Sequence, residues 1–405
     1  MISNLLQSGM KIFILRQTNL IVGSVERMIQ ANNIKKRILE LLVENKKMLI
    51  YLFIAIIIGL ILISPEDVLW AVDRDAYFRR ATYSGYFIRR SFGNVISWFT
   101  NEPLFLYFYH YAGYIFSQYG VIKLNVFSAV LLTLLGLGRM TKYNKWVLFF
   151  LLFFPMFLLK YTTHIRQGLA MGVYFLGLSF LVKNENIGKW KYLSVIRYFS
   201  VLIHTSFVFV FGIEFLERIM KRRNLKFSMR IFIMGILGLV LSYGIPIGVY
   251  LLGDRRMGEH TFRMSPNASG LGIIMWIVFG MLLFVLVTYE ITSIGFKKIK
   301  IRNMNVPWII IEKQKDLSTN DLVTNMSIYS ILIFSITYFT LDFAARNFEN
   351  LLPLIFVAVV NIKFKVNKNI LLVILILMGL LIWITTTGSL TRVFPTFFNI
   401  GEALR

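Results

Sequence analysis

Apolar segments of roughly 16 to 24 residues recur along the chain, and short charged stretches separate them. A helix needs about 20 apolar residues to cross a hydrocarbon core of about 30 Å. The pattern therefore predicts an all-α polytopic membrane protein with about eleven membrane segments. Full crossings are predicted at 48–64, 121–138, 146–161, 167–182, 231–252, 270–293, 325–341, 346–361 and 369–386.

Two further apolar stretches do not fit as single crossings, because each would leave a basic segment on the external side. Residues 104–120 are predicted to form a short external or re-entrant helix that lines a cavity. Residues 192–223 are predicted to form two half-height helices that turn at His204 and Thr205. Each half spans roughly 20 Å, so the turn is expected in a cavity below the outer surface.

The distribution of basic residues orients the chain. Lysines and arginines precede the first crossing, so the positive-inside rule places the N-terminus in the cytoplasm and the C-terminus outside. Residues 1–47 are predicted to be a cytoplasmic amphipathic and basic segment, and residues 48–386 the helical bundle. External loops are expected at 65–120 and 253–269, followed by an external tail at 387–405.

Composition narrows the class of protein. The chain is 57% hydrophobic with a mean hydropathy of +0.67 and a net charge of +24. In a membrane protein that charge indicates contact with anionic lipid of the bilayer rather than with nucleic acid. No cysteine is present and only four histidines are, so we expect no thiolate site and no zinc site.

Arginine and lysine are distributed differently in this topology. Twelve of the 22 arginines but only two of the 22 lysines fall outside. Guanidinium pairs bidentately with phosphate or carboxylate, so an arginine-rich external face favours an anionic ligand such as pyrophosphate. The alternative is that these arginines pair with the external acids Asp67, Asp73, Asp75, Glu102, Asp254, Glu259 and Asp342. Arg166 lies between two apolar runs with no acid nearby in the sequence. For this residue, binding of an anionic ligand is favoured over pairing with an acid of the protein.

Several short motifs occur in a distinctive order: "DRDAYF" at 73–78, "EP" at 102–103 before an aromatic helix, "IRQGLA" at 165–170, "IHTSF" at 203–207 and a late arginine-bearing span. Over roughly residues 48–360 this order resembles the EpsG-like branch of bacterial Wzy-type exopolysaccharide and O-antigen polymerases. The family has a small residue after "EP", where this chain has Leu104.

The resemblance implies a metal-independent glycosyltransferase of GT-C-like architecture, with an external-facing cavity, in the bacterial inner membrane. Its substrates would be undecaprenyl-pyrophosphate-linked oligosaccharides, and a chain-length regulator protein is a possible partner. The growing glycan would move from undecaprenyl pyrophosphate onto the non-reducing-end sugar of a lipid-linked repeat unit at the periplasmic face.

That reaction needs cations for the leaving pyrophosphate and a base for the attacking hydroxyl. Arg166 is the first candidate for the pyrophosphate, helped by Arg255, Arg256 or Arg346. His204 is the first candidate base and His164 the second. The external loop supplies further substrate-binding candidates, namely Asp73, Arg74, Asp75, Tyr77 and Glu102, whose carboxylates are alternative bases.

Two other functions remain open from the sequence. An O-antigen ligase uses the same donor and the same arginine chemistry, but such an enzyme is expected to carry its larger external domain late in the chain. A lipid-linked oligosaccharide flippase or another transporter often shows internal repeats and charges along a through-path. Here the arginines gather on one face and no repeat is evident.

Overall fold

The structure is a computed structural model that describes residues 46–63, 74–91, 102–144, 146–148, 161, 164–182, 188–252, 277–278, 280–283, 286, 293–301, 304–312, 321–337 and 342–361. The chain divides into two compact units, residues 1–53 and 54–405. Of the first unit, the described part is the start of the helix Lys46–Ile63. The packing described below lies within the second unit.

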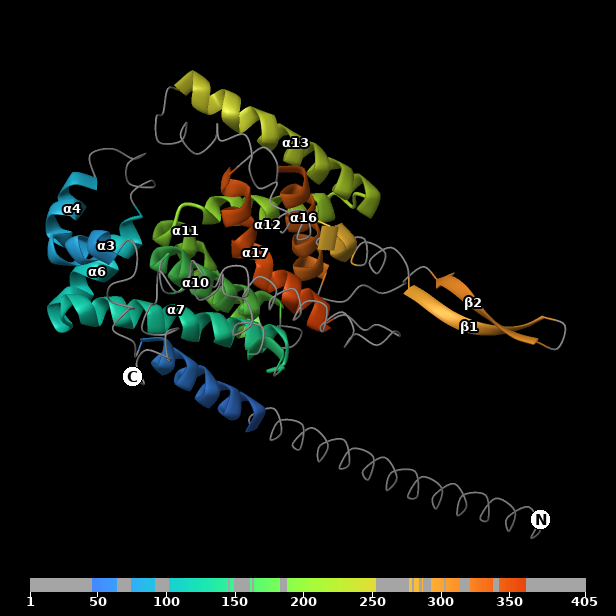
Figure 1. Cartoon of the computed structure of the whole chain (residues 1–405), viewed down its shortest axis with the longest axis horizontal. Helices are drawn as coiled ribbons and strands as arrows, with labels where there is room; N and C mark the ends of the chain where they lie inside the picture. Colours follow the sequence, from blue (N-terminus) through green and yellow to red (C-terminus); the bar gives the residue numbers. More distant parts are fainter. Residues whose placement is uncertain are drawn as a thin grey trace, which may run out of the picture. The chain divides into compact units, whose positions relative to one another are not determined.

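Helices make up most of this second unit (Figure 1). Their bounds are α3 (Arg74–Thr82), α4 (Ser84–Ser91), α6 (Pro103–Ile115), α7 (Gln118–Met140), α10 (Ile165–Val182), the 3₁₀ helix η1 (Gly188–Tyr198), α11 (Phe199–Ile203), α12 (Phe207–Arg222), α13 (Phe227–Leu252), α16 (Asp321–Thr337) and α17 (Asp342–Asn361).

Helices α7 and α10 run parallel and in close contact because glycines remove side chains from their interface. A Cβ on Gly172 would lie 2.9 Å from the Ala129 carbonyl oxygen, and one on Gly136 would lie 2.5 Å from the Phe175 backbone. Parallel neighbours require the connecting chain to return along their length. The predicted crossing 146–161 would make that return, but it falls almost entirely outside the described residues.

Side-chain contacts define two ends of the bundle. Near the start of α10, Gln167 hydrogen-bonds Asn350 of α17, and Asn350 donates to the Ser206 hydroxyl at 3.2 Å. At the other end of α17, Asn361 donates to the carbonyl of Met140, the last residue of α7, at 3.0 Å. We call the first the site end. We call the second the basic end, because it carries Arg139, Lys142, Lys221, Arg222, Arg223, Lys226 and Arg230.

Two buried glutamates of α12 join five elements inside the bundle. Glu214 accepts from Arg197 at 3.1 Å, from Arg218 at 2.6 Å and from the Tyr174 hydroxyl at 3.1 Å. One turn later, Glu217 accepts hydrogen bonds from three partners on α13 and α16: Arg230, Asn325 and Tyr329. Buried carboxylates are stable only with such partners, so these contacts fix the position of α12.

The predicted turn at His204 is confirmed. Helix α11 ends where His204 takes an extended conformation (φ −150°, ψ 121°), and α12 begins at Phe207. The stretch after "EP" forms the 13-residue helix α6, about 20 Å long, which is too short to cross a bilayer.

Four described helices are long and apolar enough to cross a membrane: Lys46–Ile63, α7, α10 and the Phe227–Gly244 part of α13. Each corresponds to a predicted crossing, and α16 and α17 match the predicted crossings 325–341 and 346–361 in position. By length and composition, these apolar helices are compatible with a polytopic membrane protein. The predicted crossing 369–386 and most of 270–293 lie outside the described residues.

The described part contains one pair of strands, β1 (Ser293–Ile301) and β2 (Met304–Glu312), in the Lys-rich segment after the predicted crossing 270–293. They form an antiparallel hairpin in which Ser293 pairs with Glu312 and Ile301 with Met304. Isoleucine, valine and tryptophan favour extended backbone, and Pro307 is tolerated because each strand of a two-stranded sheet is an edge.

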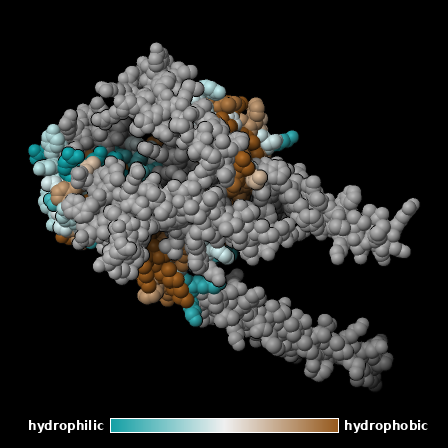
Figure 2. Space-filling view, in the orientation of Figure 1, coloured by the Kyte–Doolittle hydropathy of each residue, from teal (hydrophilic) through white to brown (hydrophobic). Residues whose placement is uncertain are grey.

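Helix α13 presents an apolar outer face of the kind that lipid covers. Its exposed side chains include Phe232, Ile236, Leu239 and Val240, and hydrophobic surface lies along this helix in Figure 2. The α3–α4 region shows hydrophilic surface in the same view. The two kinds of surface separate helices that fit a lipid environment from helices that fit an aqueous one.

Candidate active site

Three segments that are distant in the sequence meet at Glu102. The Nη1 of Arg166, in the first turn of α10, donates to Glu102 Oε2 and forms an ion pair with it across 64 residues of sequence. The Nδ1 of His204 lies 3.6 Å from Glu102 Oε1. The carboxylate therefore stands between the arginine and the histidine that the sequence singled out.

The backbone of Glu102 is unusual. This residue has left-handed dihedral angles (φ 55°, ψ 62°), which cost a non-glycine residue about 1–2 kcal/mol. Pro103 follows at the first position of α6, which suits a proline. The Glu102 side chain does not cap its own helix. Strain of this kind persists where the surroundings hold it, and it is concentrated at functional sites.

Helix α3 covers the arginine. Tyr77 and Arg80 lie one turn apart and so share a face of this helix. The guanidinium of Arg166 lies 5.6 Å from the centroid of the buried Tyr77 ring and 5.8 Å from that of Phe105 on α6. Arg80 is near enough for its charge to act on both Arg166 and Glu102. The cluster thus holds two guanidinium groups and one carboxylate.

The turn between α11 and α12 completes the site. The Ser206 backbone N–H donates to His204 Nδ1 at 3.2 Å, and the Thr205 backbone hydrogen-bonds the Glu102 carboxylate. Asn350 of α17 donates to the Ser206 hydroxyl. The turn is therefore held from α6 and from α17 as well as by its own backbone.

Exposure shows from which side a ligand can reach the cluster. The Glu102 side chain is 7% exposed, whereas the side chains of Arg166 and His204 are 26% and 24% exposed. The Nε of Arg166 is buried and has no hydrogen-bond partner within the described part of the chain. A ligand would meet Arg166 and His204 first and Glu102 behind them.

Burial is the largest influence on the pKa values of Glu102 and Arg80. It raises the pKa of the Glu102 carboxyl above its ordinary value, and the charges of Arg166 and Arg80 with the Thr205 hydrogen bond offset only part of that rise. Burial and the nearby Arg166 lower the pKa of the Arg80 guanidinium. Both guanidinium groups stay charged at neutral pH, so the three groups carry an excess positive charge that an anion would neutralise.

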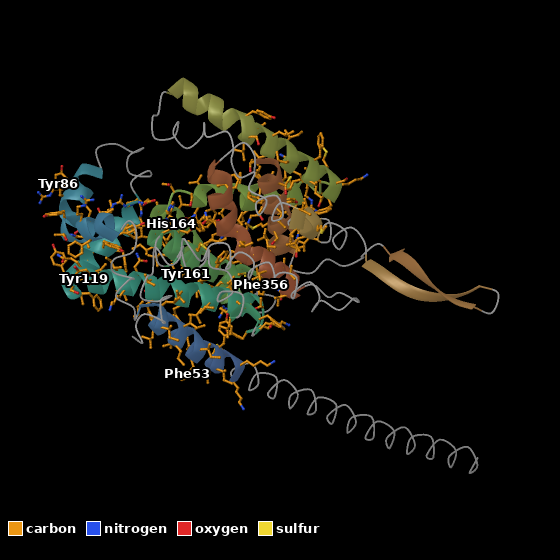
Figure 3. All side chains as sticks on the ribbon, in the orientation of Figure 1. Phe53, Tyr86, Tyr119, Tyr161, His164 and Phe356 are labelled. Carbon is orange, nitrogen blue, oxygen red and sulfur yellow. The ribbon has the colours of Figure 1, made fainter. Side chains whose placement is uncertain are left out.

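Other predicted site residues are placed less fully. Asp73, Arg255 and Arg256 lie outside the described residues, and Arg74 and Asp75 begin α3 with side chains that are also outside them. Arg346 lies in α17 one turn before Asn350, and its side chain is likewise outside the described part. His164 stands immediately before α10, where its carbonyl accepts the Gly168 N–H at 3.0 Å (Figure 3).

The sequence did not single out four residues that the structure adds to the site: Arg80, Gln167, Ser206 and Asn350. Gln167 and Asn350 are buried polar side chains, and their mutual hydrogen bond links the start of α10 to α17. The three-residue spacing from Tyr77 to Arg80 could have indicated that they share a face of a helix. No local pattern indicated the link from residue 167 to residue 350.

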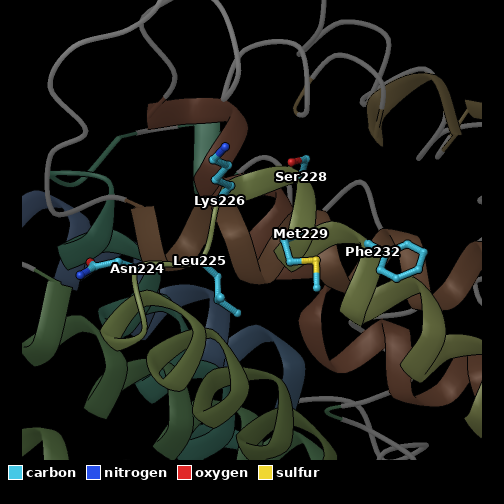
Figure 4. Close-up of a pocket in the computed structure, with 6 residues that line it drawn as sticks. All are labelled: Asn224, Leu225, Lys226, Ser228, Met229 and Phe232. Atoms are coloured by element: carbon cyan, nitrogen blue, oxygen red, sulfur yellow. The ribbon is translucent and has the colours of Figure 1, made fainter.

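Metal ligands are not grouped in the described part of the chain, where no set of three or more His, Asp or Glu side chains could hold an ion. The groups suited to an anion are the guanidiniums of Arg80 and Arg166. A separate depression of about 560 Å³ lies at the α12–α13 turn, at the basic end (Figure 4). Its lining of Asn224, Leu225, Lys226, Ser228, Met229 and Phe232 contains no acid, and we assign it no chemistry.

Comparison with known proteins gives one decisive result. The model of the EpsG family matches residues 49–397, which is most of the chain. The chain belongs to the EpsG family. No curated protein and no solved structure matches it significantly. Membership of the EpsG family makes the chain a polysaccharide polymerase-type membrane protein, as its motifs predicted, and all three segments that meet at Glu102 lie inside the matched region.

Proposed function

We propose that this EpsG-family protein is a glycosyltransferase that polymerises a lipid-linked polysaccharide. It moves a growing glycan from undecaprenyl pyrophosphate onto a hydroxyl of the non-reducing-end sugar of a lipid-linked repeat unit. The observation that carries the proposal is the cluster of the buried Glu102 with the partly exposed Arg166 and Arg80, in which two cations lie near one carboxylate.

The two arginines would stabilise the negative charge that develops on the leaving pyrophosphate. The acceptor oxygen bonds to the anomeric carbon of the donor while the bond from that carbon to the pyrophosphate oxygen breaks. The pyrophosphate leaves with the electron pair and gathers negative charge, which waiting cations stabilise. Arg166 gives one donor to Glu102 and, with five N–H donors in its guanidinium, keeps others for the pyrophosphate. Arg80 supplies the second charge.

These two guanidiniums supply the positive charge that a divalent cation would otherwise provide, so the proposed transfer needs no metal and no cofactor. The second need is a base within hydrogen-bond reach of the acceptor hydroxyl. Glu102 pairs with Arg166, and His204 lies beside Glu102, so these two residues are the candidates for the base. The buried rings of Tyr77 and Phe105 pack near the Arg166 guanidinium and help to hold it in place.

The proposal includes an orientation. The basic end of the bundle, with its lysines, fits the cytoplasmic side of a bacterial inner membrane. The site end then faces the periplasm, where lipid-linked repeat units would be joined, with the N-terminus in the cytoplasm and the C-terminus in the periplasm. We further propose undecaprenyl-pyrophosphate-linked oligosaccharides and the bilayer as partners, with a chain-length regulator protein acting beside them.

The test is extension of purified lipid-linked repeat units by the purified protein in detergent or nanodiscs, followed by analysis of product length. We expect a ladder of longer glycans that persists in EDTA. Loss of the ladder in EDTA and its return with magnesium or manganese would overturn the metal-free mechanism. Transfer to lipid A core without a ladder would identify a ligase, and movement of lipid-linked units across a membrane without transfer would identify a flippase.

A further inference from the structure

We infer that Glu102 is the general base that takes the proton from the acceptor hydroxyl, and that His204 is a positioning residue that holds the turn facing Glu102. This assignment rests on the proposed transfer reaction and reverses the order of candidates that the sequence suggested. It depends on hydrogen bonds around the α11–α12 turn.

A hydrogen bond within its own turn occupies one ring nitrogen of His204. Its Nδ1 accepts the Ser206 backbone N–H at 3.2 Å, so the lone pair of that nitrogen is occupied. A neutral histidine whose Nδ1 accepts carries its proton on Nε2. Such a ring has no lone pair left for a substrate hydroxyl. In this arrangement, His204 can orient groups but cannot accept a proton from them.

The competing arrangement is a dyad in which Glu102 orients His204 and the histidine acts as the base through Nε2. It would need a proton on Nδ1, directed at Glu102 Oε1. The 3.6 Å separation of these two atoms exceeds a hydrogen bond, whereas the Ser206 N–H is within bonding distance of the same nitrogen. A proton on Nδ1 would also face the Ser206 N–H, placing two donors against each other.

The turn cannot easily relax to relieve that conflict. Ser206 is tied to Asn350 of α17 at 3.2 Å, and the fully buried Asn350 is tied in turn to Gln167 of α10. The Thr205 backbone hydrogen-bonds Glu102 itself. Because Gln167 follows Arg166 directly, this chain of contacts holds the turn in register with the arginine.

Glu102 has the properties that a base requires. Its two oxygens face different partners: Oε2 takes the Arg166 N–H, and Oε1 lies on the His204 side, toward the more exposed part of the site. The groups around it are Tyr77 and Arg80 from α3, Arg166 from α10, and His204 with the Thr205 backbone from the turn. Burial raises the pKa of this carboxyl, which strengthens it as a proton acceptor. The proton passes to Glu102 as the acceptor oxygen bonds to the anomeric carbon, and the pyrophosphate leaves unprotonated.

The experiment compares two substitutions of His204. In His204→Asn, Oδ1 is separated from Cα by the same number of bonds as the histidine Nδ1, so it can accept the Ser206 N–H but cannot serve as a base. In His204→Ala, this acceptor is absent. If His204 only positions the turn, we expect His204→Asn to lower kcat less than about tenfold and His204→Ala to lower it much more. Removal of a general base costs about 10² to 10⁴ in rate, so equal losses of that size in both variants would overturn the inference.

Glu102→Gln and the pH profile complete the test. We expect Glu102→Gln to lower kcat by about 10² to 10⁴, while inorganic pyrophosphate, measured by calorimetry, binds at least as tightly as to the wild-type protein because the change removes a negative charge beside both guanidiniums. The acid limb of the kcat profile should persist in His204→Asn, because it reports Glu102. Disappearance of that limb in His204→Asn would assign the base to His204. Failure of the wild-type protein to extend lipid-linked repeat units would instead refute the proposed function, whatever the variants show.

Discussion

Arg166, in the first turn of α10, and Glu102, the residue immediately before α6, form an ion pair across 64 residues of sequence. Each group accounts for the position of the other. A buried carboxylate needs a cation, and an arginine at the start of an apolar helix needs an anion. Arg80 adds a second cation, and Glu102 is the carboxylate that acts on both arginines among the described residues, so the cluster keeps positive charge for a ligand.

Arg166→Ala should abolish chain extension in cells, because it removes the guanidinium that contacts both the carboxylate and the proposed pyrophosphate. Loss of one preorganised donor to a developing anion costs about 10² to 10³ in rate. The measurement is polysaccharide length in cells, with protein in the membrane fraction measured alongside. Arg218→Ala, which removes a half-exposed arginine of α12, is the matched control and should leave long polysaccharide. Long chains in the Arg166→Ala cells would remove this residue from the site.

The sequence predicted the helices near this pair but not the pair itself. Hydropathy located α7, α10 and α13, and the charge rule required the break at His204. Those signals are local, since they depend on residues within one helix and its flanks. Glu102 meets Arg166 only because the starts of α6 and α10 lie close together in the folded chain. The residues that flank either one in the sequence do not indicate this contact. The Asn350–Ser206 contact was hidden for the same reason.

Arg80→Gln should move the acid limb of the kcat profile to higher pH. The charge of Arg80 lowers the pKa of Glu102, so its removal lets burial raise that pKa further. Glu102 acts as a base only when ionised, which means that activity is present above its pKa and is lost as the pH falls through it. A higher pKa therefore brings the loss at a higher pH. The check is the pH dependence of extension at saturating donor; an acid limb that stays in place or moves down would show that Arg80 does not act on the base.

Glu214→Leu should destabilise the protein by about 3–5 kcal/mol, because it leaves Arg197 buried without its acid. The side chain of Arg197 is only 3% exposed, and Glu214 is its ion-pair partner. Arg218 pairs with the same carboxylate but is 42% exposed, so Arg218→Ala should cost at most about 1 kcal/mol. Thermal unfolding in detergent measures both. Equal effects of the two changes would show that the buried network does not hold α12.

Gly136→Ala should weaken the contact between α7 and α10. The added methyl group would lie 2.5 Å from the backbone of Phe175, so the helices must separate at a cost of about 1–3 kcal/mol. Gly212→Ala is the matched control, because a Cβ there meets nothing within 4 Å and alanine favours a helix over glycine by about 1 kcal/mol. The control should therefore be neutral or stabilising in the same unfolding assay. A Gly136→Ala protein as stable as the Gly212→Ala protein would contradict the close packing.

Single cysteines can test the proposed orientation directly, because the natural chain contains none and provides an unlabelled background. Tyr83, 60% exposed between α3 and α4, reports the site end, and the exposed Lys226 after α12 reports the basic end. In spheroplasts, a membrane-impermeant maleimide should label Tyr83→Cys at once and Lys226→Cys only after the membrane is opened. The lysines and arginines at the basic end give the physical reason, since cytoplasmic loops retain positive charge. The opposite labelling pattern would place Glu102 and Arg166 on the cytoplasmic side, where the proposed periplasmic transfer could not take place.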